Sequence, residues 1–273
     1  MRSFMFLLFV ISLVAMFGVV CVAKFIAKDR SFDTCANIAK RDATENWATK
    51  VKIGIIGDSW VTDQKLDKAV LNAMLVSGIQ AEVVSSGQPG AVSRQVYRNL
   101  TSEDINPYSA RHILMDGDID YLVVVVGIND TVEHIGRDFY AHHMLCIIKA
   151  IQLRGIHPVI LEIPEYGIEI TPPKSYLNYA KRLIYRFVYD GGNHDVISAY
   201  REALSAGLSS EIMKDMSIVA FSTLTRNYHD SLDLYENPNH LSKKGYQKLG
   251  QLISETIVES YNNRVQRMAH SPL

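Results

Sequence analysis

Ser59 is the residue of this chain best placed to act as a nucleophile, because it closes the sequence Gly57-Asp58-Ser59 directly after an apolar run. A serine hydroxyl is a poor nucleophile until a base removes its proton, so Ser59 requires a histidine that can reach it. Among the nine histidines, His240 is the best candidate, since it stands just before the last predicted helix. The pair predicts nucleophilic attack on an acyl carbon.

Three further groups could stabilise the oxyanion that such an attack creates, which requires preorganised hydrogen-bond donors. Asn129, in the sequence Gly-Ile-Asn-Asp, offers a side-chain amide. At Gly90 the backbone can approach a substrate without a Cβ atom in the way. The N–H of Ser59 itself, near an expected helix N-terminus, is the third donor.

The elements that must position these residues are strands and helices in alternation. Apolar runs of strand length cover 51–57, 81–86, 121–127 and 158–163, and such continuous runs are typical of parallel strands buried on both faces. Helical periodicity follows a cap at Thr62 and recurs over 139–150 and from Ser242 onward. We expect 171–221 to be mostly helical, with room for one short strand at 217–221.

This alternation predicts an α/β domain, a three-layer α/β/α sandwich around a mostly parallel, doubly wound sheet. In such folds reactive groups lie in loops at the carboxyl ends of the strands. The loops at 57–59, 87–90 and 127–130 each follow a predicted strand. We therefore expect Ser59, Gly90 and Asn129 to meet at one edge of the sheet.

With these residues assembled, the chain resembles the SGNH, or GDSL-type, hydrolase superfamily of esterases and lipases. "GDS" at 57–59 looks like its first sequence block, and "SGQPGAVS" at 86–93 looks like its second. "GIND" at 127–130 is similar to the third block, and His240 stands five residues before Gly245, where the family has its base. Four blocks in the right order are far more specific than the Gly-Asp-Ser tripeptide alone.

The resemblance implies a flavodoxin-like SGNH fold and a role for each matched residue. Ser59 would be the nucleophile, His240 the base, and Gly90 and Asn129 the oxyanion donors, without metal or cofactor. Competing interpretations are a helix-capping serine at Ser59 and a turn residue at Asn129. We expect Asp58 to be structural, bonding loop amides, and likewise the aspartate at 130.

One position departs from the family pattern, which has Asp three residues before the histidine, where this chain has Asn237. An amide can orient an imidazole but cannot stabilise the imidazolium by charge. Three hypotheses follow: a dyad oriented by Asn237 or a backbone carbonyl, a carboxylate supplied by Glu236 or Asp233, or a weakened enzyme. The retained Ser59 and His240 favour the first two.

The N-terminal segment, 1–24, contains an apolar run from Phe4 to Ala23 that is long enough to span a bilayer or to act as a signal peptide. We expect a polar tether over 25–50, a catalytic domain over 51–265 and a tail over 266–273. N-terminal segments of this kind usually direct export, which predicts an anchored or secreted protein with an extracytoplasmic domain. The basic residues after the run instead favour a cytoplasmic domain, by the positive-inside rule. Cys35 and Cys146 could pair in an oxidising compartment.

Composition excludes other classes of function. The net charge of -1 and the absence of a basic stripe argue against nucleic acid as a partner. No Cys or His spacing suggests zinc, and "GIIG" at 54–57 lacks the further glycine of a dinucleotide loop. The chain is predicted to be an ester hydrolase for O-acetylated surface carbohydrate or for lipid, or else an acyltransferase or a non-catalytic carbohydrate-binding module of the same fold.

Overall fold

The computed structural model describes residues 32–41 and 50–269, apart from 105, 117, 174, 193 and 194, together with Ser12 and Gly18. The chain divides into two units, Met1–Thr34 and Cys35–Leu273. Apart from two residues, the predicted apolar helix from Phe4 to Ala23 lies outside the described residues. Within the described part, no helix is long and apolar enough to cross a membrane.

The second unit is built on a five-stranded parallel sheet with the strand order β2-β1-β3-β4-β5. Its strands are β1 (Val51–Gly57), β2 (Ala81–Gly87), β3 (Tyr121–Val125), β4 (His157–Leu161) and β5 (Ser217–Val219). All residues of β3 and β4 are buried. This confirms the predicted parallel sheet, because side chains that alternate between two faces can all be buried only if both faces are covered.

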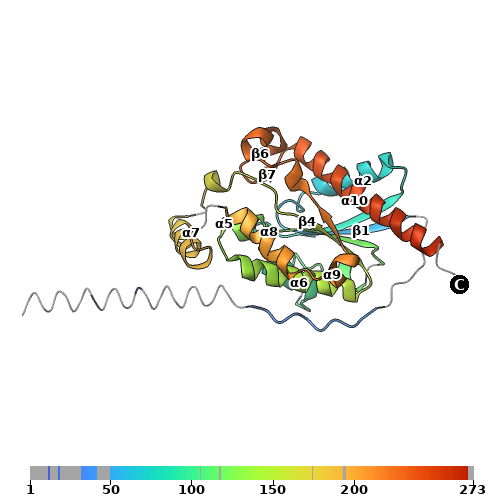
Figure 1. Cartoon of the computed structure of the whole chain (residues 1–273), viewed down its shortest axis with the longest axis horizontal. Coiled ribbons are helices and arrows are strands. Elements are labelled where there is room, and N and C mark those ends of the chain that lie inside the picture. Colours follow the sequence, from blue (N-terminus) through green and yellow to red (C-terminus); the bar gives the residue numbers. More distant parts are fainter. Residues whose placement is uncertain are drawn as a thin grey trace, which may run out of the picture. The chain divides into compact units, whose positions relative to one another are not determined.

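Helices cover both faces and give the predicted three layers. On one face α2 (Lys65–Val76) packs against α10 (Lys243–Ala269), and on the other α6 (Arg137–Leu153) packs against α3 (Ser93–Thr101) and α8 (Val196–Gly207). Figure 1 shows the sheet between these two layers. The remaining helices are α4 (Arg111–Met115), α5 (Ile128–Val132), α7 (Tyr176–Tyr189) and α9 (Ser210–Lys214), with short 3-10 turns at Ile168–Ile170, Phe221–Thr223 and Tyr228–Leu234.

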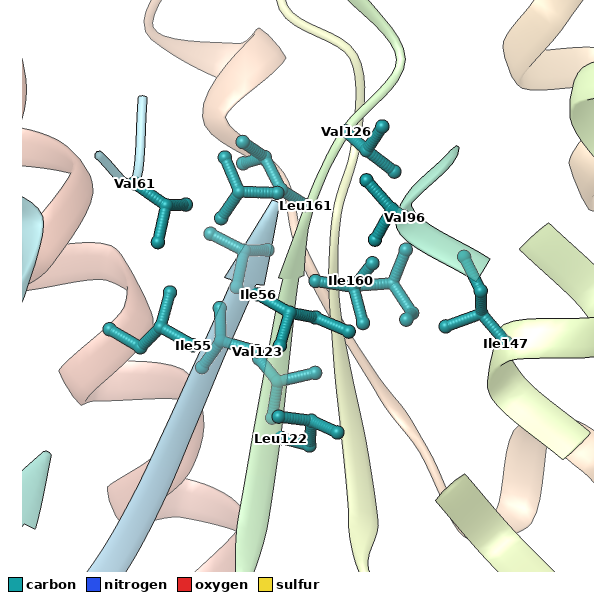
Figure 2. Close-up of a cluster of buried hydrophobic side chains, with 14 of the residues drawn as sticks. Ile55, Ile56, Val61, Val96, Leu122, Val123, Val126, Ile147, Ile160 and Leu161 are labelled. Atoms are coloured by element: carbon teal, nitrogen blue, oxygen red, sulfur yellow. The ribbon is translucent and has the colours of Figure 1, made fainter. Parts of the chain in front are cut away.

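The core lies where the central strands meet both helical layers. Figure 2 shows side chains of β1, β3 and β4 beside Val96 of α3 and Ile147 of α6. Ile55 and Ile56 are adjacent on β1 and therefore point to opposite faces, and at most 1% of either is exposed. The strand that precedes Ser59 is thus packed from both sides.

The predicted helix cap at Thr62 is wrong. Helix α2 begins only at Lys65, after Gln64 in a left-handed conformation, and no side chain caps it. Thr62 Oγ1 instead donates to the carbonyl of Ser59 at 3.0 Å, within a series of turns after β1. Ser59 therefore lies in a turn and not at the N-terminus of a helix.

The predicted boundaries also shift at both ends of the domain. Cys35 forms a disulfide with Cys146 of α6, Ile38 is buried, and the N–H of Arg41 donates to the carbonyl of Leu153 at 2.8 Å. Residues 35–41, which we expected in the polar tether, thus belong to the second unit. At the other end, α10 continues to Ala269, past the predicted start of the tail.

Candidate active site

Ser59 and His240 lie together at the carboxyl edge of the sheet. Ser59 Oγ is 3.0 Å from His240 Nε2. Ser59 follows β1, and His240 begins β7 (His240–Leu241), which pairs with β6 (Tyr235–Asn237) in a short antiparallel hairpin. Both side chains are partly exposed, so a substrate can reach the hydroxyl. This is the contact that nucleophilic activation requires.

Asn237 determines which nitrogen of His240 carries the proton. Its Oδ1 accepts hydrogen bonds from the N–H groups of Asn239 (3.2 Å) and His240 (3.0 Å), and two backbone donors identify this atom as the oxygen. The same Oδ1 lies 3.0 Å from His240 Nδ1. Since an amide oxygen only accepts, Nδ1 must carry the hydrogen, and the lone pair of Nε2 faces Ser59.

The two alternative carboxylates do not contact the imidazole. Asp233 forms an ion pair with Lys244, which lowers the pKa of Asp233. Glu236 is exposed and acts on His240 only through its charge. In the described part of the chain no carboxylate lies within hydrogen-bond distance of His240.

The surroundings of His240 favour the neutral form of its imidazole. Burial lowers the pKa of His240, and the charge of Lys65 lowers it further, whereas Glu236 and Asp63 oppose the shift. A neutral imidazole is the form that can take a proton from Ser59. The environment therefore favours a base at neutral pH.

Trp60, which the sequence did not single out, connects the loop of Ser59 with the loop of His240. Its indole Nε1 donates to the carbonyl of Asn239 at 2.9 Å, and only 1% of the residue is exposed. Its ring packs edge-on against Phe221. The sequence feature that could have identified Trp60 is a large aromatic residue with a hydrogen-bonding nitrogen directly after Ser59.

The two aspartates of the motifs are buried and bond loop amides, as predicted. Asp58 accepts from the N–H of Trp60 at 3.0 Å and from Asn129 Nδ2 at 3.2 Å. Asp130 accepts from the N–H of Ser93 at 2.9 Å and from its hydroxyl at 2.5 Å. Burial raises the pKa of each aspartate to about 7, and these hydrogen bonds oppose the rise. These hydrogen bonds link the three sequence blocks to one another.

The predicted oxyanion donors are not equivalent. Asn129 Nδ2 also donates to the carbonyl of Ala91 at 3.1 Å, so both of its N–H bonds have acceptors within the protein. By contrast, no acceptor in the described part of the chain takes the N–H of Ser59 or of Gly90. Gly90 has a φ of 71°, which an L side chain rarely adopts. Two backbone donors are thus available, and Asn129 would have to exchange one bond for a substrate oxygen.

One group of possible metal ligands lies together among the described residues, Cys35, His142 and Cys146. Both cysteines are joined in the disulfide, so neither offers the thiolate that binds a metal. His142 and Cys146 lie on α6, and none of the three residues belongs to the four motifs.

No model of a protein family matches the chain, and no curated protein matches it. Solved structures do match. The psychrotrophic esterase EstA from Pseudoalteromonas sp., in a structure inhibited by monoethylphosphonate, is 12% identical over 77% of this chain and 98% of its own, with a TM-score of 0.54. TesA is 13% identical over 76% of this chain and 97% of its own, with a TM-score of 0.53.

A GDSL-like lipase from Bacteroides thetaiotaomicron is 14% identical over 78% of this chain and 93% of its own, with a TM-score of 0.51. These structures share with this chain the central sheet and its helical layers, at an identity that supports a conclusion on fold alone. The chain therefore has the fold of the GDSL-type, or SGNH, esterases and lipases, as its four motifs predicted.

Proposed function

We propose that this protein is a serine ester hydrolase that acts through an acyl-enzyme. The observation that carries the proposal is the contact between Ser59 Oγ and His240 Nε2 at 3.0 Å, with Asn237 Oδ1 3.0 Å from Nδ1 on the other side of the ring. His240 takes the hydroxyl proton while Oγ attacks the acyl carbon, and the N–H groups of Ser59 and Gly90 stabilise the oxyanion. Asn129 adds a further donor when it releases one of its present acceptors.

The second half of the reaction uses the same residues. The ester C–O bond breaks, and the leaving alkoxide takes the proton from His240 Nε2. His240 then removes a proton from water, whose oxygen attacks the acyl carbon, and the bond to Ser59 Oγ breaks. The products are a carboxylic acid and an alcohol, and Ser59 regains its proton.

Asn237 limits the rate in this mechanism. Its oxygen keeps Nδ1 protonated and holds the ring, but a neutral amide stabilises the imidazolium less than a carboxylate would. In a serine protease, exchange of the triad aspartate for its amide costs about 10⁴-fold, largely because the tautomer is then wrong. Here the tautomer is the productive one, so the cost is much smaller.

We further propose that the domain faces an oxidising, extracytoplasmic compartment and acts there on acylated carbohydrate or lipid. The disulfide between Cys35 and Cys146 supports this side of the membrane, because disulfides are rare in reducing compartments. The apolar run from Phe4 to Ala23 supports an anchor or an export signal. Protease accessibility in intact cells tests it, and a domain that stays protected until the inner membrane is opened would support the cytoplasmic orientation.

Labelling with a fluorophosphonate probe tests the activity. We expect the wild type to be labelled, Ser59→Ala to lose the label, and Ser217→Ala to keep it. Ser217 is a matched control, because its hydroxyl also lies within hydrogen-bond distance of a histidine, His157. A wild type that is never labelled would contradict the hydrolase and support a carbohydrate-binding module that lacks working chemistry.

A further inference from the structure

Helix α7 turns its apolar side chains toward solvent, whereas the apolar stripe of most surface helices faces the core. Six of them are at least half exposed: Tyr176 (96%), Leu177 (73%), Tyr179 (52%), Leu183 (50%), Phe187 (79%) and Val188 (53%). At about 3.6 residues per turn, these positions all fall on one half of the helix, which we call the outer face of α7. Exposed apolar patches of this extent mark interaction surfaces.

Polar contacts hold the opposite side of α7 against the domain, beside α5 (Figure 1). Asn178 Nδ2 donates to Glu133 Oε2 at 2.8 Å, and Arg182 Nη2 donates to Glu133 Oε1 at 3.1 Å. Arg182 Nη1 also donates to the carbonyl of Thr171 at 3.2 Å. Only 12% of the Arg182 side chain and 15% of the Glu133 side chain are exposed. Because separating a shielded ion pair is costly, these contacts keep the outer face directed away from the domain.

The size of the outer face favours a lipid bilayer over a second copy of the chain. A helix of 14 residues is about 21 Å long, and half of its circumference presents roughly 400 Å². A stable protein interface buries about 800 Å² of each partner. A bilayer sets no such minimum, and 14 residues are too few to cross it, because about 20 are required. An amphipathic helix of this length lies along the bilayer surface.

The composition of α7 also fits the boundary between headgroups and acyl chains. Aromatic side chains are enriched at that depth, and the outer face contributes two tyrosines and a phenylalanine. The helical period places Lys181 and Arg186 at the two borders of this face, and the sequence of α7 contains no acidic residue. Long basic side chains at such borders reach lipid phosphates while their stems stay on apolar surface. Arg186 is also paired with Glu169 at 3.8 Å, so the apolar side chains supply most of the attraction.

The chain before the domain keeps a bilayer within reach of α7. Cys35 is twelve residues after Ala23, the end of the apolar run, so the chain between them spans at most about 43 Å. Cys35 is bonded to Cys146 of α6, nine residues or about 14 Å from the first residue of that helix. The C-terminal end of α7 is attached just before that first residue, since Asp190 Oδ2 lies 2.8 Å from His134 Nδ1. A bilayer that holds the apolar run is thus accessible to α7.

We propose that α7 is an interfacial helix whose outer face inserts among the headgroups of a lipid bilayer and holds the domain against it. The partner is the lipid surface itself, and the proposal does not depend on the esterase function. The apolar run makes the contact of α7 an intramolecular step, so a small face is sufficient.

Quenching by brominated lipids tests the proposal in the full chain, reconstituted into vesicles of phosphatidylcholine and phosphatidylglycerol. Phe187→Trp adds a fluorophore to the outer face. Val76→Trp is the matched control, because Val76 is 89% exposed on α2, in the other helical layer, and shares the same N-terminal run. The signal of each variant is its emission minus that of the wild type, which has two tryptophans. Bromination should lower the added emission of Phe187→Trp about twofold, because an interfacial helix sinks its apolar face about 5–10 Å, and should leave that of Val76→Trp unchanged.

Leu183→Trp, also on the outer face, should be quenched like Phe187→Trp, and circular dichroism verifies that each variant folds. Equal quenching in Val76→Trp and Phe187→Trp would overturn the proposal, because the N-terminal run alone would then bring the domain to the bilayer. An absence of quenching in Phe187→Trp and Leu183→Trp would overturn it as well, since α7 would not reach the lipid. If their emission instead moves to shorter wavelength as the protein concentration rises, the outer face binds a second copy, and the proposal is wrong.

Discussion

Two serine–histidine pairs lie at opposite edges of the same sheet. At the carboxyl edge, Ser59 Oγ is 3.0 Å from His240 Nε2, and at the amino edge Ser217 Oγ is 2.9 Å from His157 Nε2. The second pair lines a cavity of about 300 Å³, and both residues of the first pair are partly exposed. Distance and access therefore do not distinguish them.

The partner of Nδ1 does distinguish them. Arg264 Nη2 lies 2.6 Å from His157 Nδ1, and a guanidinium only donates, so Nδ1 must accept and Nε2 carries the hydrogen. His157 Nε2 then donates toward the hydroxyl oxygens of Ser217 at 2.9 Å and Ser260 at 3.3 Å, and it cannot take a proton from Ser217. At His240 the order is reversed, because the oxygen of Asn237 places the hydrogen on Nδ1.

Under the proposed function, a serine and a histidine in contact can act as nucleophile and base only when a third group leaves Nε2 without a hydrogen. The two pairs also differ in their surroundings, since the turn after β1 leaves the N–H of Ser59 without an acceptor among the described residues. Ser217 instead begins a strand that pairs with β4. The largest expected difference between the pairs is thus the effect of removing each hydroxyl.

Ser59→Ala should lower kcat/KM for p-nitrophenyl acetate by at least about 10⁴-fold, because it removes the nucleophile. Ser217→Ala should retain the wild-type value within about twofold. Steady-state hydrolysis, with circular dichroism to verify the folding of both variants, measures the contrast. Comparable losses in the two variants would show that the tautomer argument does not identify the active pair.

Asn129→Ala should lower kcat about 10²- to 10³-fold if the amide reaches the oxyanion, as removal of one such donor does elsewhere. The substitution also leaves Asp58 and the carbonyl of Ala91 without a donor, so the melting temperature should fall. The kinetic and thermal effects are separable. A lower melting temperature with kcat within about threefold of the wild type would assign Asn129 to structure alone and leave the oxyanion to Ser59 and Gly90.

Asn237→Asp places a negative charge beside Nδ1 of His240, whereas Nδ1 of His157 faces the positive charge of Arg264. A carboxylate beside Nδ1 stabilises the imidazolium, so we expect kcat to rise about tenfold. Glu236→Gln and Asp233→Asn are the controls, since neither carboxylate bonds His240. A large loss of kcat in either control, with no gain in Asn237→Asp, would show that the acid comes from elsewhere.

The sequence predicted the edge of the sheet at which the site lies, because continuous apolar runs such as β1 and β3 are buried on both faces and end at the motifs. It failed at Thr62, where a hydroxyl that looked like a helix cap bonds the carbonyl of Ser59. That choice depends on the left-handed Gln64, which periodicity does not reveal. The link from Trp60 to the carbonyl of Asn239 joins residues 179 positions apart, and no local pattern encodes it.

The smallest expected effect concerns the acid limb of the pH profile of kcat/KM. Activity requires neutral His240, so it should rise with pH through the pKa of that residue, at a midpoint below the ordinary histidine value of 6.5, because burial disfavours the charged ring. Glu236 raises this pKa and Lys65 lowers it. Glu236→Gln should therefore move the midpoint to lower pH, and Lys65→Gln to higher pH. Both shifts should shrink as salt increases, since both side chains are solvent-accessible. Shifts in the same direction, or none, would mean that the limb reports a group other than His240.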